Sequence, residues 1–167
     1  MTRVAVFFVT FLTLALCGVA AAAPGGYGPW ESTYQGAITA PAGLVCPFQV
    51  TAAPVREDLR VRYHYDEAGN IDGYQATGQL IARISNDETG KSVVRNLSGP
   101  GTVTFYPDGS YDAVLSGGFL IFLLPGDDPS SQLLLLQGHT DLHGNPDGTK
   151  SIVSHEGTSE NLCETLA

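Results

Sequence analysis

The sequence predicts an all-β domain: one antiparallel meander of about seven or eight strands, closed as a β-barrel, with a short C-terminal helix. Several segments alternate apolar and polar residues, and clusters of Gly, Pro, Asn and Asp separate them at short intervals. Before Thr158, no stretch of about ten residues shows the 3.6-residue apolar spacing of a helix. We favour a barrel over a β-sandwich because short hairpins join sequence neighbours, and closure removes the exposed edges of the sheet.

Residues 99–125 form the central hairpin of this prediction. A β-rich run at 102–106 leads into the turn Pro107-Asp108-Gly109-Ser110, and a long apolar run at 111–124 returns. Proline and glycine provide the backbone angles that such a turn requires. The return run includes residues 119–124, which are apolar on both faces and too few to span a bilayer. We therefore expect this return run to be the core strand.

The other strands are expected on the same grounds, with the first one broken by Pro54. They are predicted at residues 44–52, 59–65, 73–86, 92–97, 132–142 and 151–155. Three glycines within strands (Gly78, Gly117, Gly118) predict bulges or tight bends. Thr158 or Ser159 is expected to cap a short helix that runs through Leu166.

Residues 1–22 have the organisation of a signal peptide. Arg3 precedes an apolar stretch at 4–16 and an alanine run that ends at Ala23, and we place cleavage after Ala22. The apolar stretch is shorter than the ~20 residues that a span needs, so we expect no membrane insertion after cleavage. Residues 23–43 show neither helical nor strand periodicity and are expected to be a flexible N-terminal segment. Residues 44–167 are then the β domain of a secreted, monomeric protein.

The charge of the chain argues against binding to nucleic acid or to anionic membrane surfaces. The full sequence has 8 basic and 17 acidic side chains and a net charge of −9, and Arg3 leaves with the signal peptide. An acidic surface repels phosphate backbones and anionic lipid heads. We therefore expect no nucleic-acid partner.

Two of the three cysteines remain after signal cleavage, because Cys17 lies within the signal peptide. An even pair of cysteines in an exported chain predicts a disulfide. We expect Cys46 and Cys163 to be joined, which would tether the C-terminal segment to the start of the domain.

The most polar strand face is predicted within residues 132–143. Its odd positions begin with two leucines and continue as Gln137, His139, Asp141 and His143. Period-two spacing places these four side chains on one side of a strand, within reach of a common small ligand or metal. A zinc site needs further ligands that the sequence does not supply, and a solvated face beside a polar turn explains the same pattern. We therefore assign no metal, no cofactor and no catalytic residue.

Six short motifs are distributed over residues 44–166. They are Cys46-Pro47-Phe48, Gly90-Lys91-Ser92, the run from Asn96 to Phe105, Pro107-Asp108-Gly109-Ser110, Pro125-Gly126-Asp127-Asp128 and Leu162-Cys163. Together they resemble the motifs of uncharacterised small secreted β-rich proteins of actinobacteria. The resemblance implies export and a β fold, and it carries no known activity.

Two functions are compatible with this sequence. The first is a secreted, non-catalytic binding module, in which a small apolar ligand lies in the barrel or at its mouth against Phe119, Ile121, Leu133 and Leu135. The alternative is an extracellular barrel enzyme of the cyclase or hydrolase type, with or without a metal, that uses the face of His139, Asp141 and His143.

Overall fold

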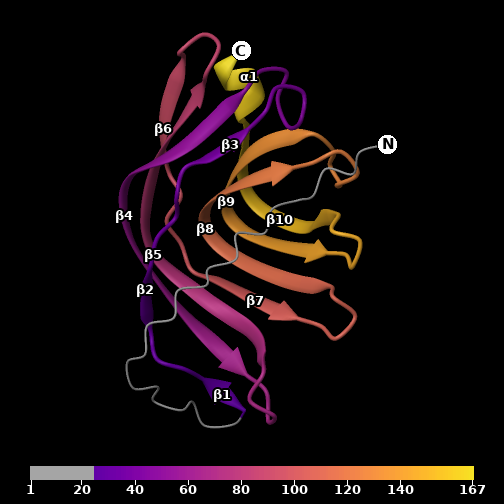
Figure 1. The fold of residues 1–167 in the computed structure, drawn as a ribbon. Helices are drawn as coiled ribbons and strands as arrows, with labels where there is room; N and C mark the ends of the chain where they lie inside the picture. The colour runs from indigo at the N-terminus through magenta and orange to yellow at the C-terminus, as the bar shows by residue number, and fades with distance from the viewer. Residues whose placement is uncertain (1–24) are drawn as a thin grey trace.

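A computed structural model describes residues 25–167, so the predicted signal peptide lies outside the described residues. These residues form one ten-stranded antiparallel sheet and a C-terminal helix (Figure 1), which confirms the all-β, antiparallel part of the prediction. The elements are β1 (Gly26–Tyr27), β2 (Glu31–Thr33), β3 (Ile38–Ala40), β4 (Val50–Tyr65), β5 (Ile71–Asn86), β6 (Ser92–Asn96), β7 (Gly101–Phe105), β8 (Tyr111–Leu123), β9 (Gln132–Gly144), β10 (Lys150–Asn161) and α1 (Leu162–Leu166).

The sheet has the strand order β1-β4-β5-β7-β8-β9-β10. The long strand β5 pairs with β6 near its C-terminal end and with β7 near its N-terminal end. The prediction of a strand at 44–52 is wrong for most of its length, because residues 44–48 form turns and bends and β4 begins at Val50. The predicted 59–65 strand belongs to the same β4, which continues through Pro54 with a register shift between Pro54 and Arg56. A bulge at this point lets the strand accommodate a residue that has no N–H to donate.

The prediction of a closed barrel is wrong. Closure would require β6 and β10 to pair, but no backbone pairing joins them, while β1, β2 and β3 lie along the outer edge of β4. These three strands come from residues 23–43, where the sequence shows no strand periodicity. Each strand has only two or three residues, which is too short for a period-two pattern to be visible.

A row of glycines crosses the sheet where β8, β9 and β10 bend (Figure 1). Gly117 pairs with Gly138, and Gly138 pairs with Gly157. Their φ angles are 104°, 134° and 148°, a region that side-chain-bearing residues rarely adopt. Glycine kinks of this kind allow strands to curve sharply. The row therefore divides each of the three strands into two arms.

The bend creates two hydrophobic clusters. The first lies between the C-terminal half of β5 and the first arm of β9, where Ile84 packs with Leu133 and Leu135, and the helix residues Leu162 and Leu166 complete it. The second cluster uses the opposite face of β8 and β9 and includes Ile121, Leu123, Leu134, Leu136 and Leu142. The first arm of β9 is therefore buried on both faces, as its continuous apolar sequence requires.

The C-terminal helix is fastened to the body of the protein. Cys163 forms the predicted disulfide with Cys46, with a Cα–Cα distance of 5.2 Å. The Nδ2 atom of the buried Asn86 donates to the carbonyl oxygen of Leu166 at 3.0 Å. The cap is Asn161 and not the predicted Thr158 or Ser159, because β10 extends through Asn161. No helix in residues 25–167 is long and apolar enough to cross a membrane.

Candidate binding sites

The sheet is not closed between β6 and β10, which face each other across a gap that we call the seam. No backbone pairing joins these two strands. Instead, Arg95 on β6 forms a two-pronged ion pair with Glu160 on β10, with Nε–Oε2 and Nη2–Oε1 distances of 2.8 and 2.7 Å. The hydrogen bond from Arg95 lowers the pKa of the Glu160 carboxyl. The charges therefore remain paired across the opening at neutral pH.

A pocket of about 310 Å³ lies at this seam, and we call it the seam pocket. It is lined by Arg95, Leu135, Gln137, Thr158, Ser159 and Glu160. Leu135 is only 3% exposed and provides the apolar part of the lining. Charged, amide and hydroxyl-bearing side chains provide the rest. This combination suits a small molecule that has both apolar and polar parts.

The predicted apolar ligand residues are divided between two faces of the sheet. Phe119 and Ile121 pair with Leu136 and Leu134, so they face away from Leu133 and Leu135. Ile121 and Leu133 are packed within the two hydrophobic clusters. Of the four predicted residues, Leu135 is the one that lines a described pocket.

The predicted polar residues share one face of β9, as period two requires. Gln137 lines the seam pocket, and His139, Asp141 and His143 follow it along the strand. His143 Nδ1 lies 2.7 Å from Asp112 Oδ1, and His139 Nε2 lies 3.5 Å from Asp141 Oδ1. Residues 25–167 contain no group of three or more His, Cys, Asp or Glu side chains suited to hold a metal ion.

Asp112 receives two hydrogen bonds on this face. The Tyr106 hydroxyl donates to its Oδ2 at 2.7 Å, and His143 contacts its Oδ1. The hydrogen bond from Tyr106 lowers the pKa of Asp112 most, and the bond with His143 lowers it further. The hydrogen bond to Asp112 raises the pKa of Tyr106. The carboxylate is therefore an acceptor held in place by its neighbours.

The same face also joins Ser116 to the predicted residues. Ser116 Oγ lies 3.2 Å from His139 Nδ1, so serine, histidine and aspartate form a connected chain. The backbone N–H groups of Ser116 and Gly118 donate to Pro100 and Ser98, and these two amides are not free to stabilise an oxyanion. His139 and Asp141 are nearly half exposed, at 48% and 41%.

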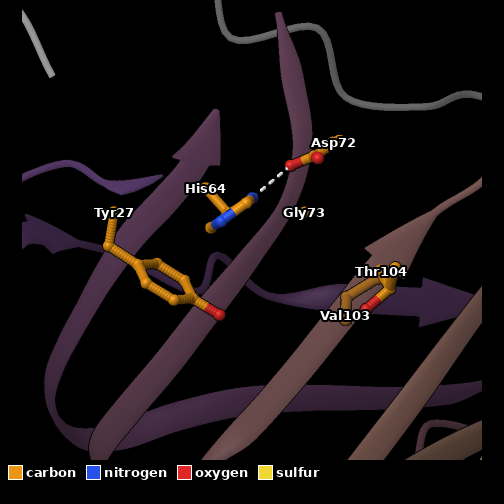
Figure 2. A pocket seen from close by; sticks show the side chains of 6 residues that line it. All are labelled: Tyr27, His64, Asp72, Gly73, Val103 and Thr104. Atoms are coloured by element: carbon orange, nitrogen blue, oxygen red, sulfur yellow. Dashed lines mark hydrogen bonds and ion pairs between the residues drawn. The ribbon is translucent and has the colours of Figure 1, made fainter. Parts of the chain in front are cut away.

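A second pocket, of about 190 Å³, is lined by residues of β1, β4, β5 and β7 (Figure 2). Figure 2 shows the Tyr27 ring beside His64, and His64 directed at Asp72, with an Nδ1–Oδ1 distance of 2.5 Å. Thr104 stands opposite on β7. This pocket and His143 on β9 lie along one line of directly paired residues that crosses the sheet. The line runs from Tyr27 through His64, Gly73, Thr104 and Asp112 to His143.

Next to this second pocket, two aromatic rings hold an arginine. The guanidinium carbon of Arg62 lies 4.5 Å from the ring centre of Tyr27 and 4.7 Å from that of Trp30. Sequence reasoning missed this arrangement because Tyr27 and Trp30 belong to the segment that was expected to be flexible. The visible signal was the alternation of Arg60, Arg62 and His64 along one strand face.

The fold and these sites together define a rolled antiparallel sheet with open, mainly polar surface pockets. Comparison with models of known protein families, with curated proteins and with solved structures gives no match. The proposals below therefore rest on the residues and their geometry.

Proposed function

We propose that this chain is a secreted, non-catalytic binding module that holds a small ligand in the seam pocket. The observation that carries the proposal is the pocket itself, which lies where the sheet is not closed by backbone pairing and reaches about 310 Å³. Ligand sites in proteins start at about this size, roughly 300 Å³. Export is supported by the disulfide between Cys46 and Cys163, since such bonds persist in oxidising compartments.

The lining of the pocket restricts the chemistry of the ligand. Leu135 offers an apolar wall, while Gln137 and Thr158 offer hydrogen-bonding groups. Arg95 and Glu160 already neutralise each other, so a charged ligand would have to break their pair. We therefore expect a small, uncharged ligand with an apolar part and a polar part. A wholly apolar ligand inside the sheet has less support, because Ile121 and Leu133 are 6% and 0% exposed in packed clusters.

Native mass spectrometry of protein purified from its own culture medium tests this proposal. We expect a bound small molecule in the wild type, and its loss in Thr158→Trp, which fills the pocket. Val153→Trp is the matched control, because Val153 lies on the same strand, is 67% exposed and lies outside the pocket. Retention of the ligand by Thr158→Trp, or protein that carries no ligand at all, would contradict the proposal.

A hydrolase is the second candidate, favoured by the chain from Ser116 through His139 to Asp141. In this alternative the serine oxygen attacks the ester carbonyl while histidine takes the serine proton, and aspartate orients the histidine. The bond to the alcohol then breaks, histidine gives the proton to the departing alcohol, and water releases the acid from the serine. The measurement is hydrolysis of a small activated ester by the wild type, Ser116→Ala and His139→Gln. Equal rates in all three proteins would eliminate this candidate, whereas a serine-dependent rate would favour it over the binding module.

A further inference from the structure

The basic side chains of the described residues are divided between paired and unpaired positions. Arg95 and Lys150 form ion pairs with Glu160 and Asp127, and Lys91 Nζ donates to the carbonyl oxygen of Ala167. No ion pair within residues 25–167 involves the other four cations. These four are Arg56, Arg60, Arg62 and Arg83.

All four unpaired arginines lie on one face of β4 and β5, and we call this group the basic stripe. Arg56, Arg60 and Arg62 pair with Ile81, Thr77 and Gln75, which are odd-numbered positions of β5, and Arg83 is the next odd position beyond Ile81. The clusters of the core use the even-numbered positions of β5, such as Ile84, so the stripe faces outward. The β5 partners of Arg56 and Arg62 are Ile81 and Gln75, which are six positions apart. Along the strand this corresponds to at most about 20 Å between the two arginines.

The stripe contains one acidic position. Asp58 pairs with Gln79, between Arg56 and Arg60, and makes no ion pair in the described chain. At its far end the stripe meets His64 and Asp72 in the pocket of Figure 2. The net charge of the stripe is therefore positive, although the whole chain carries −9.

Arg62 is held ready for a ligand. Its Nε and Nη2 both donate to Gln75 Oε1, at 2.9 and 2.7 Å, and its planar group lies over Tyr27 and Trp30. Its Nη1 makes no hydrogen bond within the described residues and remains a donor for an added acceptor. Arginine held in this way loses little side-chain entropy when it binds an anion.

We propose that the basic stripe binds an extended anionic polysaccharide, with carboxylate or phosphate groups along its sugar chain. Neighbouring like charges on a sheet repel each other, and an anionic ligand removes this repulsion. The stripe is long and exposed, so it suits a polymer lying along β4. Nucleic acid fits less well, because Arg62 covers one face of each ring that would stack on bases. This inference uses the proposed export but does not depend on the seam pocket.

The test measures binding of the mature protein to three polymers by calorimetry at low ionic strength. Oligogalacturonate supplies carboxylates, dextran phosphate supplies phosphates on a sugar chain, and unmodified dextran is the neutral reference. We expect at least one anionic polymer to bind, with affinity that falls as salt rises, and dextran not to bind. The tighter of the two anionic polymers identifies the preferred anion.

Charge-neutralising variants localise the site. Arg60→Gln removes an exposed stripe cation and is expected to weaken binding about fivefold, while Lys91→Gln removes a cation elsewhere and leaves binding unchanged. Thermal unfolding checks that both variants fold. Equal weakening by Lys91→Gln, failure of both anionic polymers to bind, or tighter binding of a single-stranded oligonucleotide of matched charge would overturn the inference. None of these results depends on occupancy of the seam pocket, so the two proposals fail separately.

Discussion

Replacing Gly138 by alanine should strongly destabilise the protein. An added Cβ would lie 2.1 Å from the carbonyl oxygen of Glu156 and 2.9 Å from the Cα of Gly157. Both atoms belong to the backbone of β10, so neither can move without disturbing the sheet. In addition, φ at this position is +134°, which alanine rarely adopts. Strain of this kind costs about 1–3 kcal/mol, and overpacking costs a similar amount.

We therefore expect Gly138→Ala to lower the free energy of unfolding by about 4 kcal/mol. For a domain of this size, 1 kcal/mol corresponds to roughly 2–4 °C, so the midpoint of thermal unfolding should fall by about 10 °C. Two controls separate the causes. Gly148 has φ +89° but no atom within 4 Å of an added Cβ, so Gly148→Ala should show the strain alone. Gly36 has open space and no such φ, so Gly36→Ala should be neutral.

Urea unfolding followed by circular dichroism provides the free energies of all three variants. We expect stability to fall in the order Gly36→Ala, Gly148→Ala, Gly138→Ala. If Gly138→Ala were as stable as Gly36→Ala, the glycine row would not be required for the bend, and the packing of β9 against β10 would have to be looser than the structure shows.

Three further predictions concern the fastenings of the sheet. Burial would raise the pKa of Asp127, but hydrogen bonds from Lys150 and from the Leu124 amide outweigh burial and lower the pKa below 3.8. The ionised Asp127 therefore stabilises the fold at neutral pH, and this contribution is lost as the pH falls below 3.8 and the carboxylate is protonated. Asp127→Asn, which removes one partner of this buried pair, should cost about 3 kcal/mol at pH 7 and less at pH 3, as urea unfolding at the two pH values would show. Reduction of Cys46–Cys163 should lower the thermal midpoint, and labelling of native, unreduced protein should find no free thiol; two labelled thiols would contradict the bond. Arg95→Gln should leave Glu160 unpaired and speed hydrogen exchange of the β10 amides near the seam, whereas unchanged exchange would show that the ion pair does not hold the seam.

The sequence was sufficient for features that depend on neighbouring residues. Alternation along 132–143 predicted that His139 and Asp141 would share a face, and the even pair of cysteines predicted the disulfide. Barrel closure was not predictable in this way, because it depends on whether β6 and β10, which are far apart in the chain, pair through their backbones. The occupation of the outer edge of β4 was not predictable either, because strands of two or three residues take it and their pairing is decided by the partner strand.

The binding sites depend on contacts between residues far apart in the chain, and this limited their prediction. Arg95 and Glu160 meet across the seam although they are 65 residues apart. Arg62 meets Tyr27 because β1 pairs with the end of β4, a pairing that the local sequence does not indicate. The apolar pattern of residues 132–136 identified a buried strand correctly, but apolar character alone does not distinguish a packed core residue from the wall of a pocket.

The position of the disulfide makes Cys46 a marker of an intact chain. Its partner Cys163 is 117 residues further along and lies in α1, so the bond forms only after the chain has been made through α1. A chain that is cut short or clipped before α1 keeps Cys46 as an unpaired thiol. Such a thiol is open to mixed disulfides with other molecules in an oxidising compartment. Damaged copies of this protein would therefore be chemically distinguishable from complete ones by a single reactive sulfur.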